Sequence, residues 1–127
     1  MAGSHAWLAM QKAWSNGAVY AGCSAGAMIL ARRIPSFRLA GTHAGFNIVP
    51  VRFILPHFDA FPTMVKPLVM ALKTQLKKGE RLIGVDEETA LVGQLGGEWK
   101  VLGQSKVHVF THEGSQTYES GQTLLLN

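Results

Sequence analysis

The chain has 127 residues, of which 47% are hydrophobic and 16% are charged. The charged share is low beside the ~25% of an average soluble domain, and this composition excludes a disordered chain. No apolar run approaches the ~18 to 20 residues that a membrane-spanning helix needs, so a transmembrane helix is excluded as well. The length predicts a single globular domain over residues 1–127, built around one core.

The net charge of +4 is distributed unevenly along the chain. Residues 1–79 carry nine Lys or Arg against one acid, whereas residues 80–127 carry three against seven. The basic residues are scattered, without the clusters and interleaved aromatic residues of a nucleic-acid surface. We therefore expect no nucleic-acid partner, and a positive field that suits an anionic small substrate or a peptide carboxylate.

Cys23 is the only cysteine, so neither an intramolecular disulfide nor a cysteine-based zinc cluster can form. Nothing in the composition demands an oxidising compartment, and the first residues show no signal-peptide pattern. The expectation by default is a cytoplasmic protein without a metal site.

The first part of the chain predicts a layered α/β fold. Ser4 is placed to cap a helix that ends at residues 16–17. Residues 18–21 are a short apolar run typical of a strand buried on both faces of a parallel sheet, and residues 25–31 are compatible with a helix. Such a strand needs neighbours, and no strand precedes the first helix. We therefore expect the N-terminal part to be missing, and a second copy or a partner chain to cover the exposed sheet edge.

The rest of the chain predicts a loop, a strand, a helix and an antiparallel extension. Residues 35–45 have the composition of a loop, and residues 51–55 that of a strand. Pro67 fits the first turn of a helix with a leucine stripe, which Gly79 stops. Glycine turns then separate short strands over residues 81–85, 89–93, 99–102, 106–110 and 123–126.

Gly22-Cys23-Ser24-Ala25-Gly26 matches the G-x-S-x-G pattern of a nucleophile elbow, flanked by a predicted strand and helix in the required order. Such a turn is strained, needs small residues beside the serine, and lifts the serine hydroxyl clear of the sheet. The backbone N–H of Ala25 can then stabilise an oxyanion. A plain glycine-rich turn is the alternative. Cys23 lies one position too early to be the nucleophile and is interpreted as a small buried residue.

A serine nucleophile needs a base and an acid that orients the base. His57 directly follows a predicted strand, where the active sites of α/β proteins gather. His108 alternates within a late strand and is interpreted as a surface residue. The acid is left open between Asp59 and residues 86–88. The other histidines have less support from their context: His5, His43 and His112.

Three stretches resemble the cyanophycinase and dipeptidase E group of serine peptidases, which have the class I glutamine amidotransferase-like fold. Residues 17–27 resemble the nucleophile elbow of that group, and Pro56-His57-Phe58 resembles its histidine motif. Residues 84–91 resemble its acidic motif, and the order and spacing of the three stretches agree as well. The resemblance covers nearly the whole chain.

The resemblance implies that Ser24 is the nucleophile, that His57 is the general base and acid, and that Glu87 orients His57. Asp86 and Glu88 are less favoured substitutes for Glu87. It also implies a three-layer, mostly parallel sheet of the flavodoxin-like type, of which this chain is the C-terminal portion. The expected reaction is hydrolysis of small peptides or isopeptides, and it requires no cofactor.

Two alternatives to an active peptidase are kept. One is a catalytically inactive family fragment that serves as a structural or interaction module through its exposed sheet edge. The other is a glutamine amidotransferase-like subunit, which is disfavoured because Ser24 stands where a cysteine is expected. Cyanophycin is not the expected substrate, because cyanophycinases carry several arginines after the histidine motif and residues 58–66 contain none.

Overall fold

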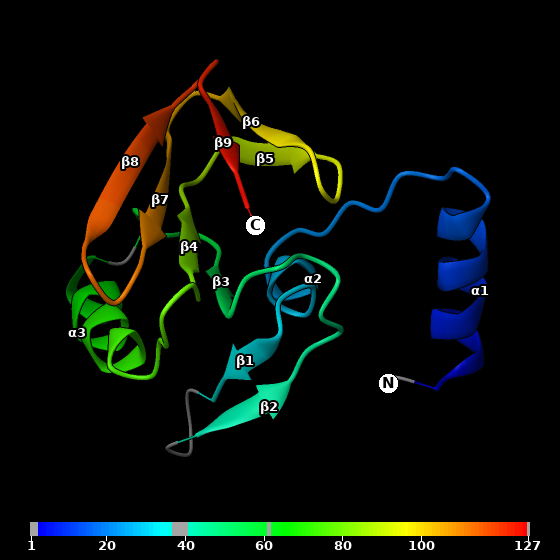
Figure 1. Cartoon of the computed structure of the whole chain (residues 1–127), viewed down its shortest axis with the longest axis horizontal. Helices are drawn as coiled ribbons and strands as arrows, with labels where there is room; N and C mark the ends of the chain where they lie inside the picture. The colour runs from blue at the N-terminus through cyan, green and yellow to red at the C-terminus, as the bar shows by residue number, and fades with distance from the viewer. Residues whose placement is uncertain (1–2, 37–40, 61, 127) are drawn as a thin grey trace.

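The computed structural model describes residues 3–36, 41–60 and 62–126, which form three helices and nine strands (Figure 1). The helices are α1 (His5–Ser15), α2 (Ala25–Met28) and α3 (Pro62–Lys73). The strands are β1 (Arg33–Pro35), β2 (Thr42–Ala44), β3 (Phe53–Leu55), β4 (Leu82–Val85), β5 (Thr89–Gly93), β6 (Glu98–Gly103), β7 (Lys106–Phe110), β8 (Ser115–Glu119) and β9 (Thr123–Leu125). They make three sheets, in the orders β1-β2, β3-β4-β7-β8 and β5-β6-β9.

The four-stranded sheet divides its apolar side chains between two cores. Phe53 and Leu82 belong to the core that includes Leu72 of α3. Ile54 and Ile83, the next residues along the same strands, belong to a second core. Residues of the β5-β6-β9 sheet and Ala31, which follows α2, share this core. Because successive residues of a strand face opposite sides, this alternation buries β3 and β4 on both faces.

The described part of this sheet is mixed rather than mostly parallel. β3 and β4 pair in parallel, with Ile54 opposite Ile83, and α3 lies in the connection between them. β7 pairs antiparallel with β4 and with β8, and residues 111–114 suffice to join β7 to β8 because antiparallel neighbours need no long crossover. The mixed α/β class and the antiparallel C-terminal part are thus confirmed, and β3 with β4 is the parallel pair among the described strands.

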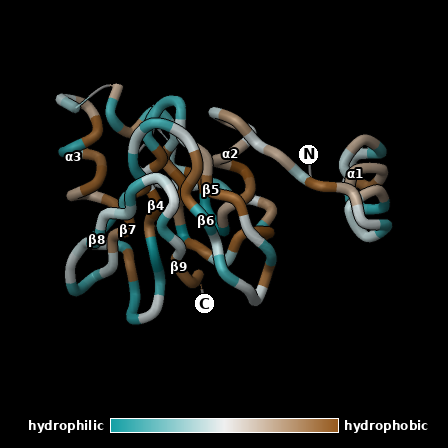
Figure 2. Tube along the Cα trace, turned by 90° about the horizontal axis from the view of Figure 1, so that it is seen from above, coloured by the Kyte–Doolittle hydropathy of each residue, from teal (hydrophilic) through white to brown (hydrophobic). Residues whose placement is uncertain are grey.

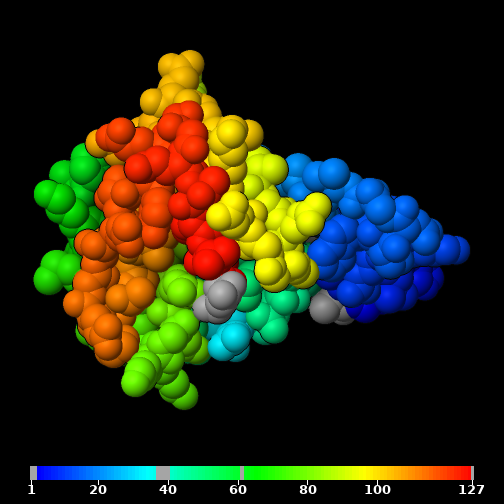
Figure 3. Space-filling view, turned by 45° about the horizontal axis from the view of Figure 1, so that its top comes forward, coloured from blue at the N-terminus to red at the C-terminus, as the bar shows by residue number. Residues whose placement is uncertain are grey.

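The segment before Ser24 departs most from the expected structure. Residues 18–21 join none of the three sheets, and Val19 is 91% exposed. The predicted buried strand is therefore absent here, because no described strand lies beside it to share its backbone hydrogen bonds. Helix α1, which the sequence placed correctly, lies apart from the sheets (Figures 1 and 2) and projects from the body (Figure 3). Its buried side chain, Trp7, stacks on Phe46 with ring centroids 3.8 Å apart.

Three further elements differ from the sequence-based expectation. Within residues 35–45, predicted as a loop, residues 42–44 form β2, which pairs antiparallel with β1 so that Ile34 lies opposite His43. Residues 37–40 of this prediction lie outside the described residues. Helix α3 begins at Pro62, so Pro67 lies inside it, and it ends before Gly79. β8 was missed, since Gly114 and Ser115 have the composition of a turn. No helix in the described ranges is long and apolar enough to cross a bilayer.

Candidate active site

His57 stands between Ser24 and Glu87. Its Nε2 lies 3.2 Å from Ser24 Oγ, and its Nδ1 lies 3.2 Å from Glu87 Oε1. A neutral imidazole carries one N–H, and the carboxylate can only accept, so this network places the proton on Nδ1. Nε2 is then left to accept the hydroxyl proton of Ser24. The three side chains singled out from the sequence therefore form one hydrogen-bonded row.

Neighbouring strands bring His57 and Glu87 together. His57 follows β3 and Glu87 follows β4, and the carboxyl ends of two parallel strands lie at the same edge of a sheet. The backbone N–H of Phe58 donates to the Val85 carbonyl at 3.1 Å, which continues the attachment beyond the strand ends. Two residues that are far apart in sequence are thereby held side by side.

A strained turn positions Ser24 at the start of α2. Ser24 has φ 53° and ψ −122°, on the side of the φ range that residues other than glycine rarely adopt. Gly26 N–H closes the turn by donating to the Cys23 carbonyl at 2.8 Å. A Cβ on Gly22 would overlap the Gly26 carbonyl, so the expected small residue is required there. A Cβ on Gly26 would meet no described atom within 4 Å, so the expected requirement at position 26 is not found.

Two neighbours of Ser24 offer different groups to a substrate. The Ala25 N–H begins α2 and has no acceptor among the described residues, so it is free to donate to an oxygen held near Ser24 Oγ. Cys23 is exposed, so its interpretation as a buried residue is wrong. It makes no hydrogen bond with His57 within the described ranges, so Ser24 rather than Cys23 is the candidate nucleophile that His57 contacts.

The three acids at positions 86–88 have different surroundings, although they are adjacent in the sequence. Asp86 is 6% exposed, and its carboxylate accepts hydrogen bonds that fasten it to β7 and to the turn before it. The partners are Ser105 Oγ at 2.7 Å, Lys106 N at 3.2 Å and His108 Nε2 at 2.9 Å. Glu88 has a positive φ of 53°, and its carbonyl accepts from Gln104 N–H at 2.9 Å. Glu87 is therefore the acid of this run that reaches His57.

His108 is not the surface residue that its position in a late strand suggested. Its side chain is 23% exposed, and it stacks against Phe58 with ring centroids 4.6 Å apart. Phe58 in turn lies so close to β4 that a Cβ on Gly84 would overlap its ring. The residue next to His57 is thus packed between Gly84 and His108, which sequence reasoning missed because no local pattern brings these positions together.

The Asp59 side chain forms no hydrogen bond or ion pair with His57 in the described part of the chain. Its Oδ1 accepts from the backbone N–H of Glu87 at 2.7 Å. The geometry therefore does not support Asp59 as the acid that orients the base. Its contact is with the acidic loop, residues 86–88, instead.

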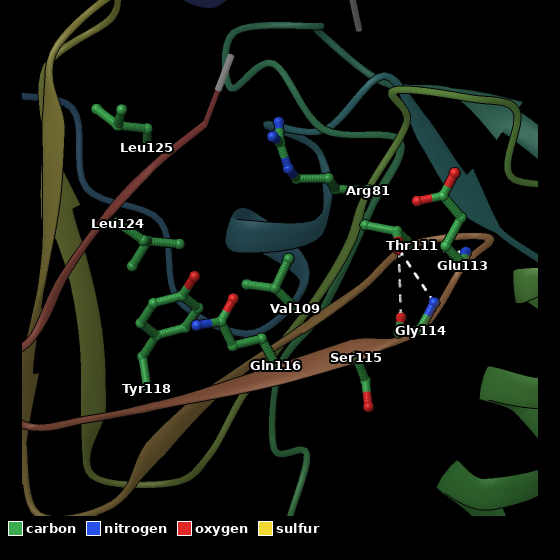
Figure 4. Close-up of a pocket in the computed structure, with 10 residues that line it drawn as sticks. All are labelled: Arg81, Val109, Thr111, Glu113, Gly114, Ser115, Gln116, Tyr118, Leu124 and Leu125. Carbon is green, nitrogen blue, oxygen red and sulfur yellow. Dashed lines mark hydrogen bonds between the residues drawn. The ribbon is translucent and has the colours of Figure 1, made fainter.

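The row of three side chains is open to solvent. Ser24 is exposed, and the side chains of His57 and Glu87 are 44% and 53% exposed. A cavity of about 370 Å³ lies elsewhere, between the β7-β8 hairpin and β9. Figure 4 shows Arg81 and Glu113 on one side of this cavity and Leu124 on the other. None of the three catalytic candidates lines it. The described residues also hold no group of three His, Cys, Asp or Glu side chains arranged for a metal ion.

Fold and site together define a mixed α/β protein with a serine, a histidine and a glutamate in hydrogen-bonded sequence. The model of peptidase family S51 matches residues 1–98, and the chain belongs to this family. The resemblance inferred from the motifs is thereby confirmed.

The chain is also similar to a solved structure of a peptidase. The crystal structure of a peptidase from an acI-B1 Actinobacterium is 35% identical in sequence and superposes with a TM-score of 0.77. The match covers 93% of this chain and 50% of that one, so the chain spans about half the length of its relative. The search of the curated proteins gave no match.

Proposed function

We propose that this chain carries the catalytic residues of a serine peptidase that hydrolyses small peptides or isopeptides. The observation that carries the proposal is the pair of 3.2 Å contacts by which His57 joins Ser24 to Glu87. Membership of peptidase family S51 and the likeness to a peptidase structure agree with it. In this proposal Ser24 is the nucleophile, His57 the general base and acid, and Glu87 the orienting acid.

The first half of the reaction makes an acyl-enzyme. Ser24 Oγ attacks the carbonyl carbon of the scissile amide while its proton passes to His57 Nε2. The Glu87 carboxylate accepts from Nδ1–H and so stabilises the imidazolium that forms. The free N–H of Ala25 donates to the developing oxyanion. The C–N bond then breaks, and His57 gives its proton to the leaving amine.

The second half reverses these roles with water as the nucleophile. His57 Nε2 takes a proton from a water molecule, whose oxygen attacks the Ser24 ester. Collapse of the second tetrahedral intermediate returns the proton from His57 to Ser24 Oγ and releases the carboxylate product. Every step uses side chains or backbone groups of the chain, so the proposed reaction involves no cofactor.

The proposal includes a finer account of the fold. The turn at Ser24 is a nucleophile elbow, and residues 18–21 become a paired strand of a three-layer sheet when further strands lie beside them. The positive φ of Ser24 and the overlap that Gly22 avoids support the elbow. The proposed location is the cytoplasm, because the sole cysteine makes no demand for an oxidising compartment.

A fluorophosphonate probe tests the nucleophile directly. Ser24 Oγ attacks the phosphorus, fluoride leaves, and the hydroxyl proton goes to His57, so intact mass reports one adduct. We expect labelling of the wild type and of two controls, Cys23→Ala and the exposed-serine variant Ser120→Ala, and none of Ser24→Ala. Labelling of folded Ser24→Ala, or no labelling of folded wild type, would contradict the proposal.

A second candidate function is an inactive family fragment that acts as an interaction module. The observation that favours it is the apolar segment 18–21, which joins no described sheet and exposes Val19. Size-exclusion chromatography with light scattering tests it, since a monodisperse, well-folded monomer that binds no apolar dye would count against pairing through this segment. A glutaminase is less favoured, because the exposed Cys23 does not contact His57, and an assay of glutamine hydrolysis checks it.

A further inference from the structure

We propose that Asp59 is a positioning residue, which holds Glu87 in reach of His57; this inference rests on the proposed function. Asp59 Oδ1 accepts a 2.7 Å hydrogen bond from the Glu87 backbone N–H. A carboxylate that accepts from an N–H makes a stronger bond than a neutral acceptor does. Asp59 makes no hydrogen bond or ion pair with His57 or Ser24 among the described residues, so we infer that it acts on the reaction through Glu87.

Glu87 needs such a restraint because its side chain is half exposed. It is 53% exposed, and its contact with His57 is 3.2 Å long. A glutamate side chain has three rotatable bonds and loses considerable rotamer freedom when it is held in one geometry. A solvent-exposed hydrogen bond of this kind contributes little by itself. Fixing the backbone from which the side chain starts reduces the number of arrangements that compete with the productive one.

Both backbone polar groups of Glu87 are held by side chains. Its N–H donates to Asp59, and its carbonyl accepts from Thr89 Oγ1 at 3.0 Å. Thr89 begins β5, the strand that directly follows the acidic loop (residues 86–88), so this bond restrains the loop but does not connect it to the segment that carries His57. The Asp59 bond differs, because Asp59 belongs to the histidine loop (residues 56–60) and so connects that loop to the acidic loop.

Asp59 closes a small ring that contains the proposed base and its acid. The ring runs from His57 along the backbone to Asp59, across the hydrogen bond to Glu87 N, and back through the Glu87 side chain to His57 Nδ1. A further backbone bond, from Ala60 N–H to the His57 carbonyl at 3.1 Å, makes a turn of the histidine loop. Because the histidine loop and the acidic loop are joined by two contacts, Asp59 to Glu87 N and His57 to the Glu87 side chain, we expect a shift of one loop to move the other.

The Asp59 side chain carries both an acceptor and a negative charge, and two substitutions separate them. Asp59→Asn keeps an Oδ1 that accepts from Glu87 N–H but removes the charge. Asp59→Ala removes both. Asp59→Leu keeps the number of side-chain heavy atoms and the branching at Cγ but has no acceptor, and it replaces Asp59→Ala if that variant does not fold. Glu113→Ala is the matched control, because Glu113 is an acid of another loop whose side chain is 75% exposed.

The experiment measures the rate at which the fluorophosphonate labels Ser24 in each variant, together with the Glu87 amide signal in ¹⁵N NMR spectra. We expect labelling of Asp59→Ala to be slower by roughly tenfold, since small misplacements of catalytic groups cost this much or more. Asp59→Asn should restore the rate to within about threefold, and Glu113→Ala should match the wild type. The Glu87 amide proton should shift upfield and exchange faster in Asp59→Ala but not in Asp59→Asn.

Three results would overturn the inference in different ways. Wild-type rates in a folded Asp59→Ala variant would show that Glu87 needs no such restraint. Equal losses in Asp59→Asn and Asp59→Ala, with the Glu87 amide unchanged in the Asn variant, would show that the charge acts and the hydrogen bond does not. Failure of the wild type to label, with the Glu87 amide still responding to Asp59→Ala, would remove the proposed function and leave the contact purely structural.

Discussion

The segments that lead into the proposed catalytic residues are held in two different ways. β3 and β4 lead to His57 and Glu87, pair with each other, and are buried on both faces. Residues 18–21 lead to Ser24, join no described sheet, and expose Val19 almost fully. Even so, Ser24 Oγ lies within hydrogen-bonding distance of His57.

This difference shows that sheet pairing and local turn geometry can position residues of the same site independently. The proposed base and acid, His57 and Glu87, are positioned by paired strands, whose register is fixed by two cores. The proposed nucleophile, Ser24, is positioned by the turn itself, in which Gly22 fits against the Gly26 carbonyl and the Ser24 backbone is strained. Strain of this kind persists only where the surrounding structure holds it. The serine side of the site is therefore the part that additional strands would stabilise most.

The largest expected effect is on activity and comes from removal of the proposed base, which contacts both Ser24 and Glu87. His57→Ala should slow fluorophosphonate labelling of Ser24 by about 10³-fold or more, because no other described histidine contacts this serine. Since the His57 side chain is 44% exposed, the midpoint of urea unfolding should change little. His112→Ala is the control. A labelling rate close to that of the wild type would remove His57 from the mechanism.

The next effect compares a residue of the paired strands with one of the unpaired segment. Ile83→Ala should lower the free energy of unfolding by about 2 to 5 kcal/mol, because Ile83 is 1% exposed within the larger core. Val19→Ala should lower it by less than about 0.5 kcal/mol, because the side chain is 91% exposed. Urea unfolding monitored by circular dichroism measures both. A large loss in Val19→Ala would mean that another chain covers this segment in solution.

Gly84 and Gly26 allow a comparison between a tightly packed position of the paired strands and an open position beside Ser24. Gly84→Ala would drive a Cβ into the Phe58 ring and should destabilise the fold by about 1 to 3 kcal/mol. Gly26→Ala meets open space within α2 and should be neutral or stabilising by up to about 1 kcal/mol. Thermal unfolding measures the difference. If Gly26→Ala lowers the stability as much as Gly84→Ala does, another part of the protein or a second chain must cover residue 26 in solution.

The smallest effect concerns an ion pair at the amino ends of β3 and β4. Glu80 Oε1 lies 3.2 Å from Arg52 and from Arg32. Burial acts to raise the pKa of the Glu80 carboxyl, but the hydrogen bond from Lys77 N–H and the two guanidinium charges outweigh it, so the pKa lies below its usual value.

A lowered pKa in the folded protein means that ionised Glu80 stabilises the fold at neutral pH and loses this effect as the pH falls through the folded-state pKa. Glu80→Gln should therefore cost about 1 kcal/mol at pH 7. The difference from the wild type should shrink below the ordinary glutamate pKa of about 4.3. Urea unfolding across pH 3 to 7 measures it, with the exposed-acid variant Glu98→Gln as control. A difference that is constant over this range would contradict the assignment.

Sequence reasoning succeeded where one segment contains its own explanation. The alternation in residues 106–110 predicted β7 with the bounds that the structure has, and Ser4 caps α1 through a bond to Trp7 N–H. It failed for residues 18–21, whose apolar composition describes a buried strand but supplies no neighbour. It also failed for β8, because a polar strand at the side of a sheet is stabilised by its pairing with β7 rather than by its own pattern.

The sequence by itself determined the local features of this protein: the small residues around Ser24, the strand that ends before His57, and the acids that lie between two apolar runs. Local chemistry suffices for these, because turns and alternating strands depend on neighbours along the chain. Only the tertiary structure decided which acid meets the histidine. The backbone of residues 86–88 directs Asp86 to His108 and Glu87 to His57, and this outcome depends on the parallel register of β3 and β4, which no single segment encodes.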